Sequence, residues 1–201
     1  MAELQIWLQD LASASPAPGG GGASALVGAV AASLGRMVGC LTDGKKKYAA
    51  YQEDILRIMA ETDALKDRLY ALIQADADAF VPLSAAYGIP KDDPTRAETL
   101  EAALRVAAEP PMTMLETLAE LPPILEELCE KGSKLAISDV GCAAVFASSA
   151  ASGALLNLFV NTRLMQDKAY AAAQNEKAAA LEQEICSRCK AVYETVKEGL
   201  V

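Results

Sequence analysis

The sequence contains no histidine, and this absence restricts the chemistry open to the protein. Imidazole is the side chain that most often transfers protons near neutral pH, so any such transfer here must use Asp, Glu, Lys, Tyr or Cys. Basic residues are also scarce, because 18 Lys and Arg stand against 27 Asp and Glu, which gives a formal net charge of −9. Nucleic acids bind to basic surfaces, so we expect no nucleic-acid partner.

The cysteines show no pattern typical of a metal site or a disulfide framework. A single CxxC motif, Cys186 to Cys189, lies inside a predicted helix and has no second pair. A structural zinc site needs about four ligands and no histidine is available, so we predict no metal site. The first residues, MAELQIWLQDL, do not resemble a signal peptide. We therefore expect a cytoplasmic protein with reduced thiols at its five cysteines, which are Cys40, Cys129, Cys142, Cys186 and Cys189.

Two apolar stretches, residues 23–41 and 140–160, are long enough to be mistaken for membrane spans. The first carries only Arg36, and the second carries no charged residue. Both consist mainly of Ala, Gly and Ser, which gain little free energy on transfer into lipid. We therefore predict two buried helices with closely packed neighbours, and no membrane partner.

Helix-forming residues dominate the chain, and no long stretch alternates apolar and polar residues as a strand would. This pattern predicts an all-α fold, a bundle of long helices in a single domain over residues 1–201. Prolines at 110–111 and 122–123 predict kinks or a break in one helix. Ser138 or Asp139 is expected to cap the following helix, and Asp167 the last one. Gly44 is expected to end the helix over 22–42 in the left-handed conformation. Helical spacing predicts that one side of the last helix carries Leu181, Ile185, Cys189, Val192 and Val196. The predicted helical regions are 4–11, 22–42, 45–85, 95–131, 139–160 and 168–198.

One carboxylate, Asp76, occupies a position where the helical pattern calls for an apolar residue. Burial of an isolated carboxylate is costly, so Asp76 must be paired, hydrogen-bonded or neutral. Two interpretations remain open: a structural Asp that caps another helix or meets an Arg, or a carboxyl with a raised pKa that carries a proton. Its seam alternates spacings of three and four and consists of Tyr48, Tyr51, Ile55, Ile58, Thr62, Leu65, Leu69, Leu72, Asp76, Ala79 and Leu83.

Three further groups of polar residues allow both a structural and a functional interpretation. The lysines at 45–47 are either solvated or hold a polyanionic tail in an otherwise acidic protein. Asn157 and Asn161 lie one helical turn apart, so they either cross-link helices or face a polar ligand. Asp139, at a predicted helix start, is either a cap or a ligand anchor.

The segment SPAPGGGGAS, residues 15–24, stands directly ahead of the first apolar stretch. Glycine has no Cβ, so such a loop can bring its backbone close to another group. The N–H groups at the start of the next helix can also donate hydrogen bonds to a ligand. No strand precedes the segment, so the usual context of a nucleotide-binding loop is missing.

Several segments, taken together and in order, resemble the cyclodeaminase/cyclohydrolase family of folate one-carbon metabolism. The resemblance extends over nearly the whole chain and rests on SPAPGGGGASALVGAVAASLGRMVGCLT, GKKKY, LIQADADAF, GIPKD, GSKLAISDVG and GALLNLFVN. Two features depart from the family pattern. Gln74 replaces the usual acid, and a fourth glycine follows the usual three, which leaves the register of the glycine loop open by one residue.

The resemblance implies an all-helical subunit that forms a homodimer and binds a polyglutamylated folate beside the glycine-rich segment. It implies that Asp76, in QADADAF, is catalytic, and helical phase singles out the same residue. The lysines are then expected to hold the glutamate tail, and no cofactor beyond the tetrahydrofolate substrate is expected. The predicted substrate-binding residues are Pro18, Gly19, Gly20, Gly21, Gly22, Ser24, Lys45, Lys46, Lys47, Asp139, Asn157 and Asn161.

Two family reactions fit a single proton carrier. A methenyltetrahydrofolate cyclohydrolase adds water to the 5,10-methenyl carbon and opens the ring to 10-formyltetrahydrofolate. A formiminotetrahydrofolate cyclodeaminase closes that ring with release of ammonia. The chain carries the GKKKY form and no formiminotransferase domain, which favours the cyclohydrolase. A non-catalytic folate-binding bundle is the alternative from another class, and it predicts a buried cation beside Asp76.

Overall fold

The structure is a computed structural model that describes residues 2–201. Helices are the only regular secondary structure in this range, which confirms the predicted all-α fold. Two short 3₁₀ turns, η1 (Lys46–Tyr51) and η2 (Lys134–Ala136), stand ahead of α3 and α6. The α-helices are α1 (Ala2–Leu11), α2 (Gly20–Thr42), α3 (Gln52–Tyr87), α4 (Arg96–Leu118), α5 (Leu121–Lys131), α6 (Ile137–Thr162) and α7 (Lys168–Glu198).

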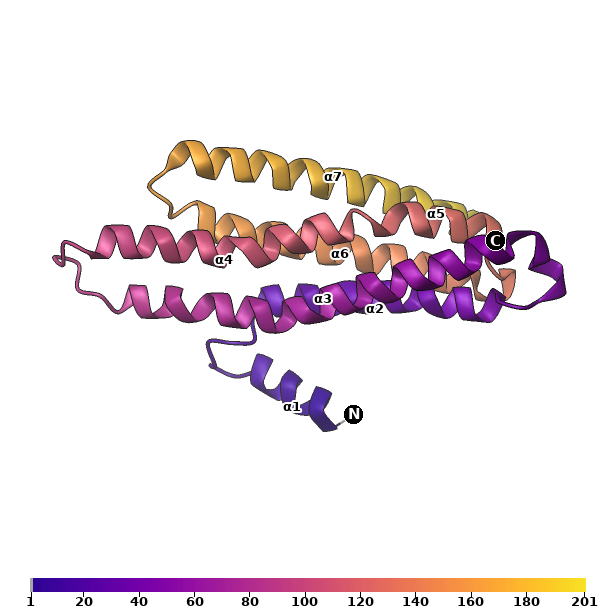
Figure 1. The fold of residues 1–201 in the computed structure, drawn as a ribbon, viewed down its shortest axis with the longest axis horizontal. Helices are drawn as coiled ribbons and strands as arrows, with labels where there is room; N and C mark the ends of the chain where they lie inside the picture. The colour runs from indigo at the N-terminus through magenta and orange to yellow at the C-terminus, as the bar shows by residue number, and fades with distance from the viewer. Residues whose placement is uncertain (1) are drawn as a thin grey trace.

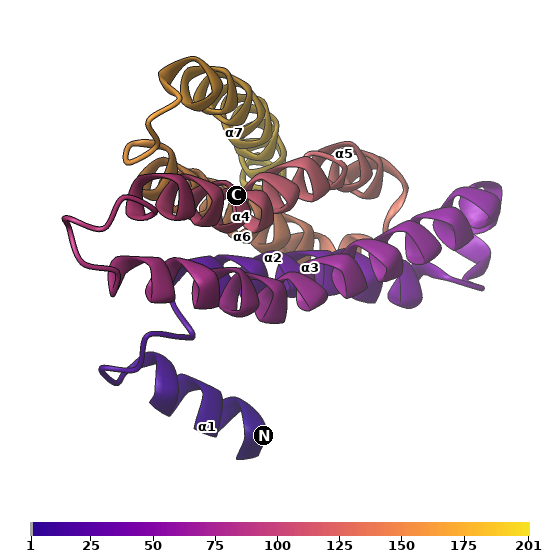
Figure 2. The same cartoon turned by 60° about the vertical axis from the view of Figure 1, so that its left-hand side comes forward.

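Helices α2 to α7 run along the long axis of the molecule (Figure 1). α2 packs between α3 and α6, and α6 also packs on α4 and α7. α2 and α6 are antiparallel: Gly20, at the start of α2, faces Asn157 near the end of α6, whereas Thr42, at the end of α2, accepts a hydrogen bond from the Ser133 N–H ahead of α6. α1 lies outside the bundle, joined to it by the proline- and glycine-rich loop (Figure 2).

Both apolar stretches form helices of this bundle. α2 and the segment Lys134–Thr162 are long and apolar enough to cross a membrane, with mean hydropathies of 1.6 and 1.7. Their small residues bring the two helices close together, since a Cβ at Gly153 would overlap the Ser24 hydroxyl. Only 50% and 39% of their apolar windows are buried, so each helix keeps one uncovered apolar side.

The predicted seam of α3 is confirmed, although the helix starts later than predicted. Residues 46–51 form η1 instead of a first helical turn, and the Tyr48 hydroxyl accepts a hydrogen bond from the Lys134 N–H at 3.0 Å. Asp76 is half-buried on the seam. The buried seam residues of α3 are Ile55, Ile58, Thr62, Leu65, Leu69, Leu72, Ala79 and Leu83.

Of the predicted kink or break at prolines 110–111, the break is absent, because α4 continues through both residues. Pro111 has no N–H, so the carbonyl of Ala107, one turn earlier, loses its partner in the helix. Asn161 of α6 supplies the missing bond, and its Nδ2 lies 2.9 Å from that carbonyl oxygen. The chain does break before Pro122, which lies in the first turn of α5, where a missing N–H costs nothing.

Helix ends follow the predictions at two of three positions. Gly44, after α2, adopts the left-handed conformation with φ +68°, and Asp167 caps α7 by accepting the Tyr170 N–H at 3.0 Å. The predicted cap at Ser138 or Asp139 is wrong. α6 begins at Ile137, directly after the 3₁₀ turn η2, so both residues already lie within its first turn.

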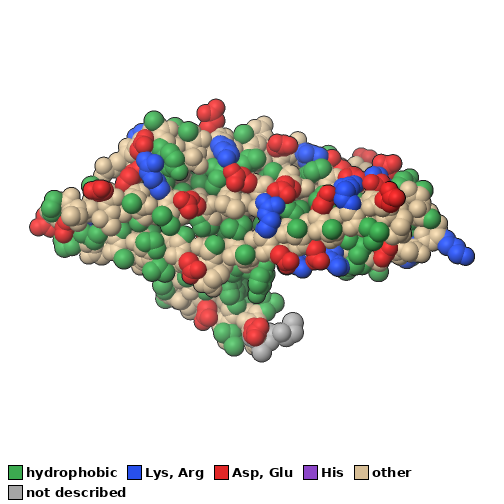
Figure 3. All heavy atoms as spheres, in the orientation of Figure 1, with side chains coloured by type: hydrophobic (Ala, Val, Ile, Leu, Met, Phe, Trp, Pro, Cys, Tyr) green, Lys and Arg blue, Asp and Glu red, His purple; other side chains and the backbone are tan. Residues whose placement is uncertain are grey.

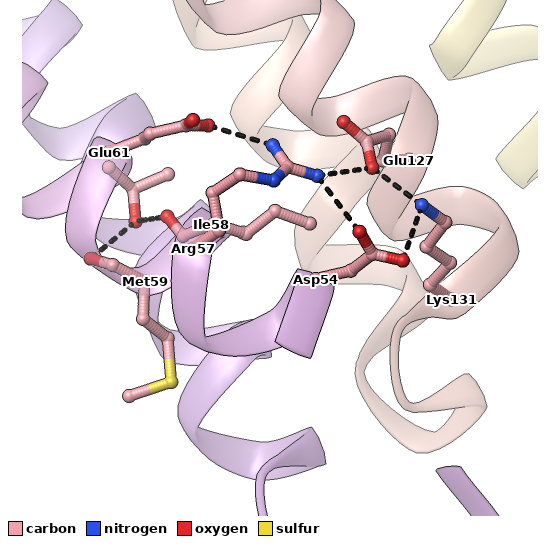
Figure 4. Close-up of polar contacts among 8 residues, drawn as sticks. Asp54, Arg57, Ile58, Met59, Glu61, Glu127 and Lys131 are labelled. Atoms are coloured by element: carbon pink, nitrogen blue, oxygen red, sulfur yellow. Dashed lines mark hydrogen bonds and ion pairs between the residues drawn. The ribbon is translucent and has the colours of Figure 1, made fainter. Parts of the chain in front are cut away.

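Charged side chains of both signs are scattered among apolar ones over the face that Figure 3 shows. At the start of α3 they form a network with α5 (Figure 4). Arg57 lies 2.7 Å from Glu127, and Lys131 lies 2.8 Å from Asp54 and 2.7 Å from Glu127. This network joins α3 to α5 and neutralises the two cations within it.

Candidate active site

The first turn of α2 meets the side chain of Asp76, which projects from α3. The Gly22 N–H donates a hydrogen bond to Asp76 Oδ2 at 2.9 Å. The first N–H groups of a helix have no acceptor within the helix and carry the positive end of its dipole. Gly19, the residue before α2, offers no side-chain cap. Asp76 therefore caps α2 from a neighbouring helix, as the structural interpretation of this residue proposed.

Gly21 leaves the space that the Asp76 carboxylate occupies. A Cβ at position 21 would overlap both carboxylate oxygens, whereas a Cβ at Gly22 would lie at least 3.7 Å from its neighbours. A Cβ at Gly20 would come within 3.2 Å of the Asn157 amide nitrogen. The register left open by the fourth glycine is thereby fixed: Gly21 faces Asp76.

Burial raises the pKa of Asp76 above its usual range, and the hydrogen bond from Gly22 opposes this shift. No Lys or Arg of the described chain contributes to the shift. The non-catalytic interpretation required a buried cation at this position, and the structure places none there within residues 2–201. A carboxyl with a raised pKa can both accept and return a proton, as the functional interpretation proposed.

Asn157 and Asn161 come from the same face of α6 and both line the site. Asn161 Nδ2 donates to the Ala107 carbonyl of α4, and Asn157 Nδ2 donates to the Gly153 carbonyl at 2.8 Å within α6. Asn161 therefore cross-links two helices and borders the pocket at the same time. Both amide oxygens are left without a donor from residues 2–201, so they can accept hydrogen bonds from a ligand.

These groups surround a pocket of about 180 Å³ at the N-terminus of α2. Asp76 is the only ionisable side chain among the described residues that line it. The sequence analysis missed Phe80 and Val160, although helical spacing from Asp76 and Asn157 places both on the same faces. The lining residues are Pro16, Ala17, Gly19, Gly20, Gly21, Asp76, Ala77, Phe80, Ala107, Asn157, Val160 and Asn161.

The other predicted site residues divide into two groups. Pro18, Gly22 and Ser24 are neighbours in sequence of the lining residues but do not line the pocket themselves. Gly22 donates its N–H to Asp76, and the Ser24 hydroxyl donates to the Gly20 carbonyl at 2.7 Å. The predicted lysines and Asp139 are not brought to this pocket.

The lysines lie beyond the far end of α2, and this helix of 23 residues separates them from the pocket by roughly 33 Å. Asp139 lies in the first turn of α6, roughly 27 Å along the helix from Asn157. Within one chain, therefore, Lys45, Lys46, Lys47 and Asp139 do not line the pocket beside Asp76.

Comparison with known proteins places this site in a family. The family model described as formiminotransferase-cyclodeaminase matches residues 3–180. A methenyltetrahydrofolate cyclohydrolase from Methylorubrum extorquens is 35% identical over 96% of this chain and 95% of the relative. The formimidoyltransferase-cyclodeaminase of Sus scrofa is 31% identical over 96% of this chain, but the match spans only 37% of that relative.

A solved structure agrees with these sequence matches. The formiminotetrahydrofolate cyclodeaminase from Thermotoga maritima has a TM-score of 0.90 and 26% identity, with coverage of 98% of this chain and 97% of that one. The resemblance inferred from the glycine-rich segment and the Asp76 region is confirmed. The chain belongs to the formiminotransferase-cyclodeaminase family.

Proposed function

We propose that this chain is an enzyme of folate one-carbon metabolism, a methenyltetrahydrofolate cyclohydrolase that interconverts 5,10-methenyltetrahydrofolate and 10-formyltetrahydrofolate. The observation that carries the proposal is the isolated carboxyl of Asp76, half-buried in a pocket with no other ionisable side chain from residues 2–201. The cyclohydrolase from Methylorubrum extorquens, which matches the chain over nearly the full length of both, supports this choice of reaction.

In the proposed mechanism Asp76 is the single proton carrier. The carboxylate takes a proton from water as the water oxygen bonds to the methenyl carbon between N5 and N10, which gives a tetrahedral intermediate. Asp76 returns that proton to N5 as the bond from carbon to N5 breaks. The remaining hydroxyl proton leaves to solvent, and the carbon stays on N10 as a formyl group. The cation and water thus yield 10-formyltetrahydrofolate and one proton.

The backbone at the start of α2 positions the substrate in this proposal. Gly19 and Gly20 line the pocket without side chains, so a flat heterocycle can approach the helix N-terminus. The free amide oxygens of Asn157 and Asn161 accept hydrogen bonds from N–H groups on the edge of a pterin. Fixed geometry of this kind supplies a large part of the rate enhancement.

The second candidate is the cyclodeaminase reaction, in which N10 attacks the formimino carbon of 5-formiminotetrahydrofolate and ammonia leaves. The structural similarity to the Thermotoga maritima cyclodeaminase favours it. It requires the same single proton carrier, because the departing nitrogen takes up the proton that Asp76 holds. The geometry around Asp76 therefore serves both reactions, and the substrate assay distinguishes them.

Four further properties complete the proposal. The protein acts as a homodimer in the cytoplasm, on a polyglutamylated folate. It uses no cofactor beyond the tetrahydrofolate substrate, because one proton carrier balances either reaction without an electron transfer.

The decisive experiment follows the near-ultraviolet absorbance of 5,10-methenyltetrahydrofolate, which hydrolyses slowly without enzyme. Faster loss with the purified protein supports the cyclohydrolase. No such loss, together with a rise from 5-formiminotetrahydrofolate and release of ammonia, supports the cyclodeaminase instead. If the protein changes the absorbance with neither substrate, both reactions are contradicted and the non-catalytic folate-binding alternative is supported.

Two variants test the role of Asp76. Asp76→Asn should lower kcat by about 10²- to 10⁴-fold, the usual contribution of a general acid–base group. Asp78→Asn is the matched control, since Asp78 lies two residues away on α3, is exposed, and accepts a hydrogen bond from Gln74 at 2.8 Å. Equal losses in the two variants, or an active Asp76→Asn enzyme, would contradict the mechanism.

A further inference from the structure

The side-chain amide of Asn161 is held in one orientation by two hydrogen bonds. Its Nδ2 donates to the Ala107 carbonyl of α4 at 2.9 Å and to the Asn157 carbonyl of α6 at 3.0 Å, so both of its N–H groups are used. A rotation of the amide by half a turn would lose both bonds and place Oδ1 against two carbonyl oxygens. Asn161 therefore presents a fixed acceptor, Oδ1, to the pocket that it lines.

Asn157 is less constrained, although it lines the same pocket. Within residues 2–201 its Nδ2 donates to the Gly153 carbonyl alone, at 2.8 Å, so one N–H and the amide oxygen are both available. Such an amide can pair with a group that offers a donor and an acceptor together. Asn161 can pair only with a donor, so the two asparagines differ in what they recognise.

The constraint on Asn161 depends on Pro111, which lies inside α4. In an unbroken helix the Ala107 carbonyl would accept the N–H of residue 111, but proline has no N–H, and its ring crowds that carbonyl away from the helix axis. Ala107 is buried, so its carbonyl needs a donor from within the protein. The Ala107 carbonyl is thereby left for the Asn161 amide.

We propose that Pro111 is a positioning residue for substrate recognition, which fixes the Asn161 amide so that Oδ1 accepts a hydrogen bond from the 2-amino group of the pterin. This inference rests on the proposed function, because it takes a folate as the ligand. The 2-amino group carries donors, which is what an amide with only its oxygen available can bind. The adjoining N3–H and O4 of the ring offer a donor and an acceptor together, which suits Asn157 instead.

A fixed acceptor contributes to specificity in two ways. The amide is already oriented before the ligand arrives, so binding costs less conformational entropy. A heterocycle that lacks the donor leaves Oδ1 unpaired in the pocket and is rejected for that reason. Pro111 is not among the residues that line the pocket, so its contribution reaches the ligand through Ala107 and Asn161.

Two ligands that differ only at the 2-position test this recognition by isothermal titration calorimetry. They are 5-formyltetrahydrofolate and its analogue with a methyl group in place of the 2-amino group. Binding of 5-formyltetrahydrofolate to the wild-type protein tests the folate function alone. The ratio of the two Kd values tests the inference, and we expect the wild-type protein to bind the analogue about tenfold more weakly, the effect of one lost hydrogen bond.

Pro111→Ala is the decisive variant, because alanine restores the N–H that competes with Asn161 for the Ala107 carbonyl. The amide is then released, and the Kd ratio should fall from about tenfold toward about twofold. Pro110→Ala is the matched control: it makes the same change one residue earlier and supplies an N–H to the Val106 carbonyl instead. Its Kd ratio should equal that of the wild type.

Two further measurements separate positioning from a general effect on the fold. Asn161→Ala should lower the Kd ratio by itself, and adding Pro111→Ala to it should change the ratio no further, because the two residues act through one contact. In the ligand-free protein, NMR should show the Asn161 side-chain protons exchanging with solvent about tenfold faster in Pro111→Ala than in the wild type. The Asn157 side-chain amide is the internal reference and should not change.

The outcomes distinguish this inference from the proposed function. Equal binding of the two ligands by the wild-type protein would overturn the inference and leave the folate function intact. A Kd ratio that stays at the wild-type value in Pro111→Ala, or that falls equally in Pro110→Ala, would show that Pro111 does not position Asn161. Binding of neither ligand would overturn the proposed function and the inference with it.

Discussion

At the scale of a single residue, two opposing effects act on the pKa of Asp76. Burial among α2, α3 and α6 favours the neutral carboxyl, while the Gly22 N–H favours the carboxylate. Burial prevails, so the pKa is raised above the usual value. The group is thereby kept in the range where it can exchange a proton with a substrate, at a cost to the stability of the folded protein.

The first prediction concerns that cost. Folding raises the pKa of Asp76, so the folded state binds the proton more tightly than the unfolded state does. This tighter binding of the proton stabilises the folded protein. The stabilisation is fully present below the pKa that Asp76 has in the unfolded state, near 4, and is lost as the pH rises through its pKa in the folded state. Asn cannot ionise, and its Oδ1 still accepts the Gly22 N–H. We expect Asp76→Asn to have a higher Tm than the wild type at neutral pH.

The pH dependence of that difference is the control. Thermal unfolding followed by circular dichroism should give a gain in Tm for Asp76→Asn that shrinks as the pH falls toward about 4. A gain of the same size at every pH would show that ionisation of Asp76 is not its cause.

The second prediction concerns the space at Gly21. Gly21→Ala places a methyl group where the carboxylate now lies, so Asp76 must move. A displacement of about 1 Å at a reacting group can lower turnover by roughly 10²-fold. Gly22→Ala adds the same methyl group one residue later, where there is room, and keeps the N–H. Steady-state kinetics should therefore show a far larger loss for Gly21→Ala, and equal losses would reject the close contact with Asp76.

At the scale of helices, Pro111 and Asn161 form one structural unit. Pro111 deprives the Ala107 carbonyl of its partner within α4, and Asn161 of α6 replaces that partner. Asn161→Ala should leave a buried carbonyl unsatisfied and lower the free energy of unfolding by about 1–3 kcal/mol.

Pro111→Ala provides the test, because alanine restores the N–H that Ala107 lacks. Denaturant titration of the single and double variants should show that Asn161→Ala costs much less in the Pro111→Ala background. Pro110→Ala is the matched control, since it restores an N–H to a different carbonyl, that of Val106. If Pro110→Ala and Pro111→Ala reduced the cost of Asn161→Ala equally, the proposed replacement of the missing Pro111 N–H by Asn161 would be contradicted.

Helical phase predicted much of this architecture from the sequence. The seam of α3, the buried side of α7 and the caps at Gly44 and Asp167 depend on local spacing and conformation, which the sequence encodes directly. The continuation of α4 through its prolines depends instead on Asn161, a residue 50 positions further along the chain. No local rule contains that contact, so a break was predicted at 110–111 as well as at 122–123, and only the second is present.

The candidate site was predicted in part for the same reason. Asp76, the glycines and the two asparagines were found because each breaks a local pattern. The distance between these groups and the lysines follows from the length of α2 and from which neighbours it packs against, and both are properties of the assembled bundle. Phe80 and Val160 were missed because an apolar residue on a helix face gives no signal of its own.

At the scale of the whole molecule, a ligand that binds only the folded protein stabilises it. We expect 5-formyltetrahydrofolate, used as a stable folate probe, to raise the free energy of unfolding by about 2.7 kcal/mol at a concentration of 100 times its Kd. For a protein of this size that corresponds to a rise in Tm of roughly 5–10 °C. The Asp76→Asn protein should show a similar rise, since the proposal assigns Asp76 to proton transfer rather than to affinity.

An unrelated anion of similar charge, such as citrate, is the control for this measurement. A Tm that responds equally to citrate would indicate general anion binding at the lysines. No response to the folate at any concentration would contradict a folate site in this protein.

The hydrogen bond from the Gly22 N–H to Asp76 couples the backbone at the start of α2 to the protonation state of the carboxyl. Since the carboxylate that exchanges the proton also closes the first turn of α2, each proton uptake weakens that turn and each proton release strengthens it again. The Gly22 amide therefore reports the protonation state of Asp76. Its nitrogen and proton resonances will shift as Asp76 titrates, and the protonation state of the site can be followed from the main chain without a substrate present.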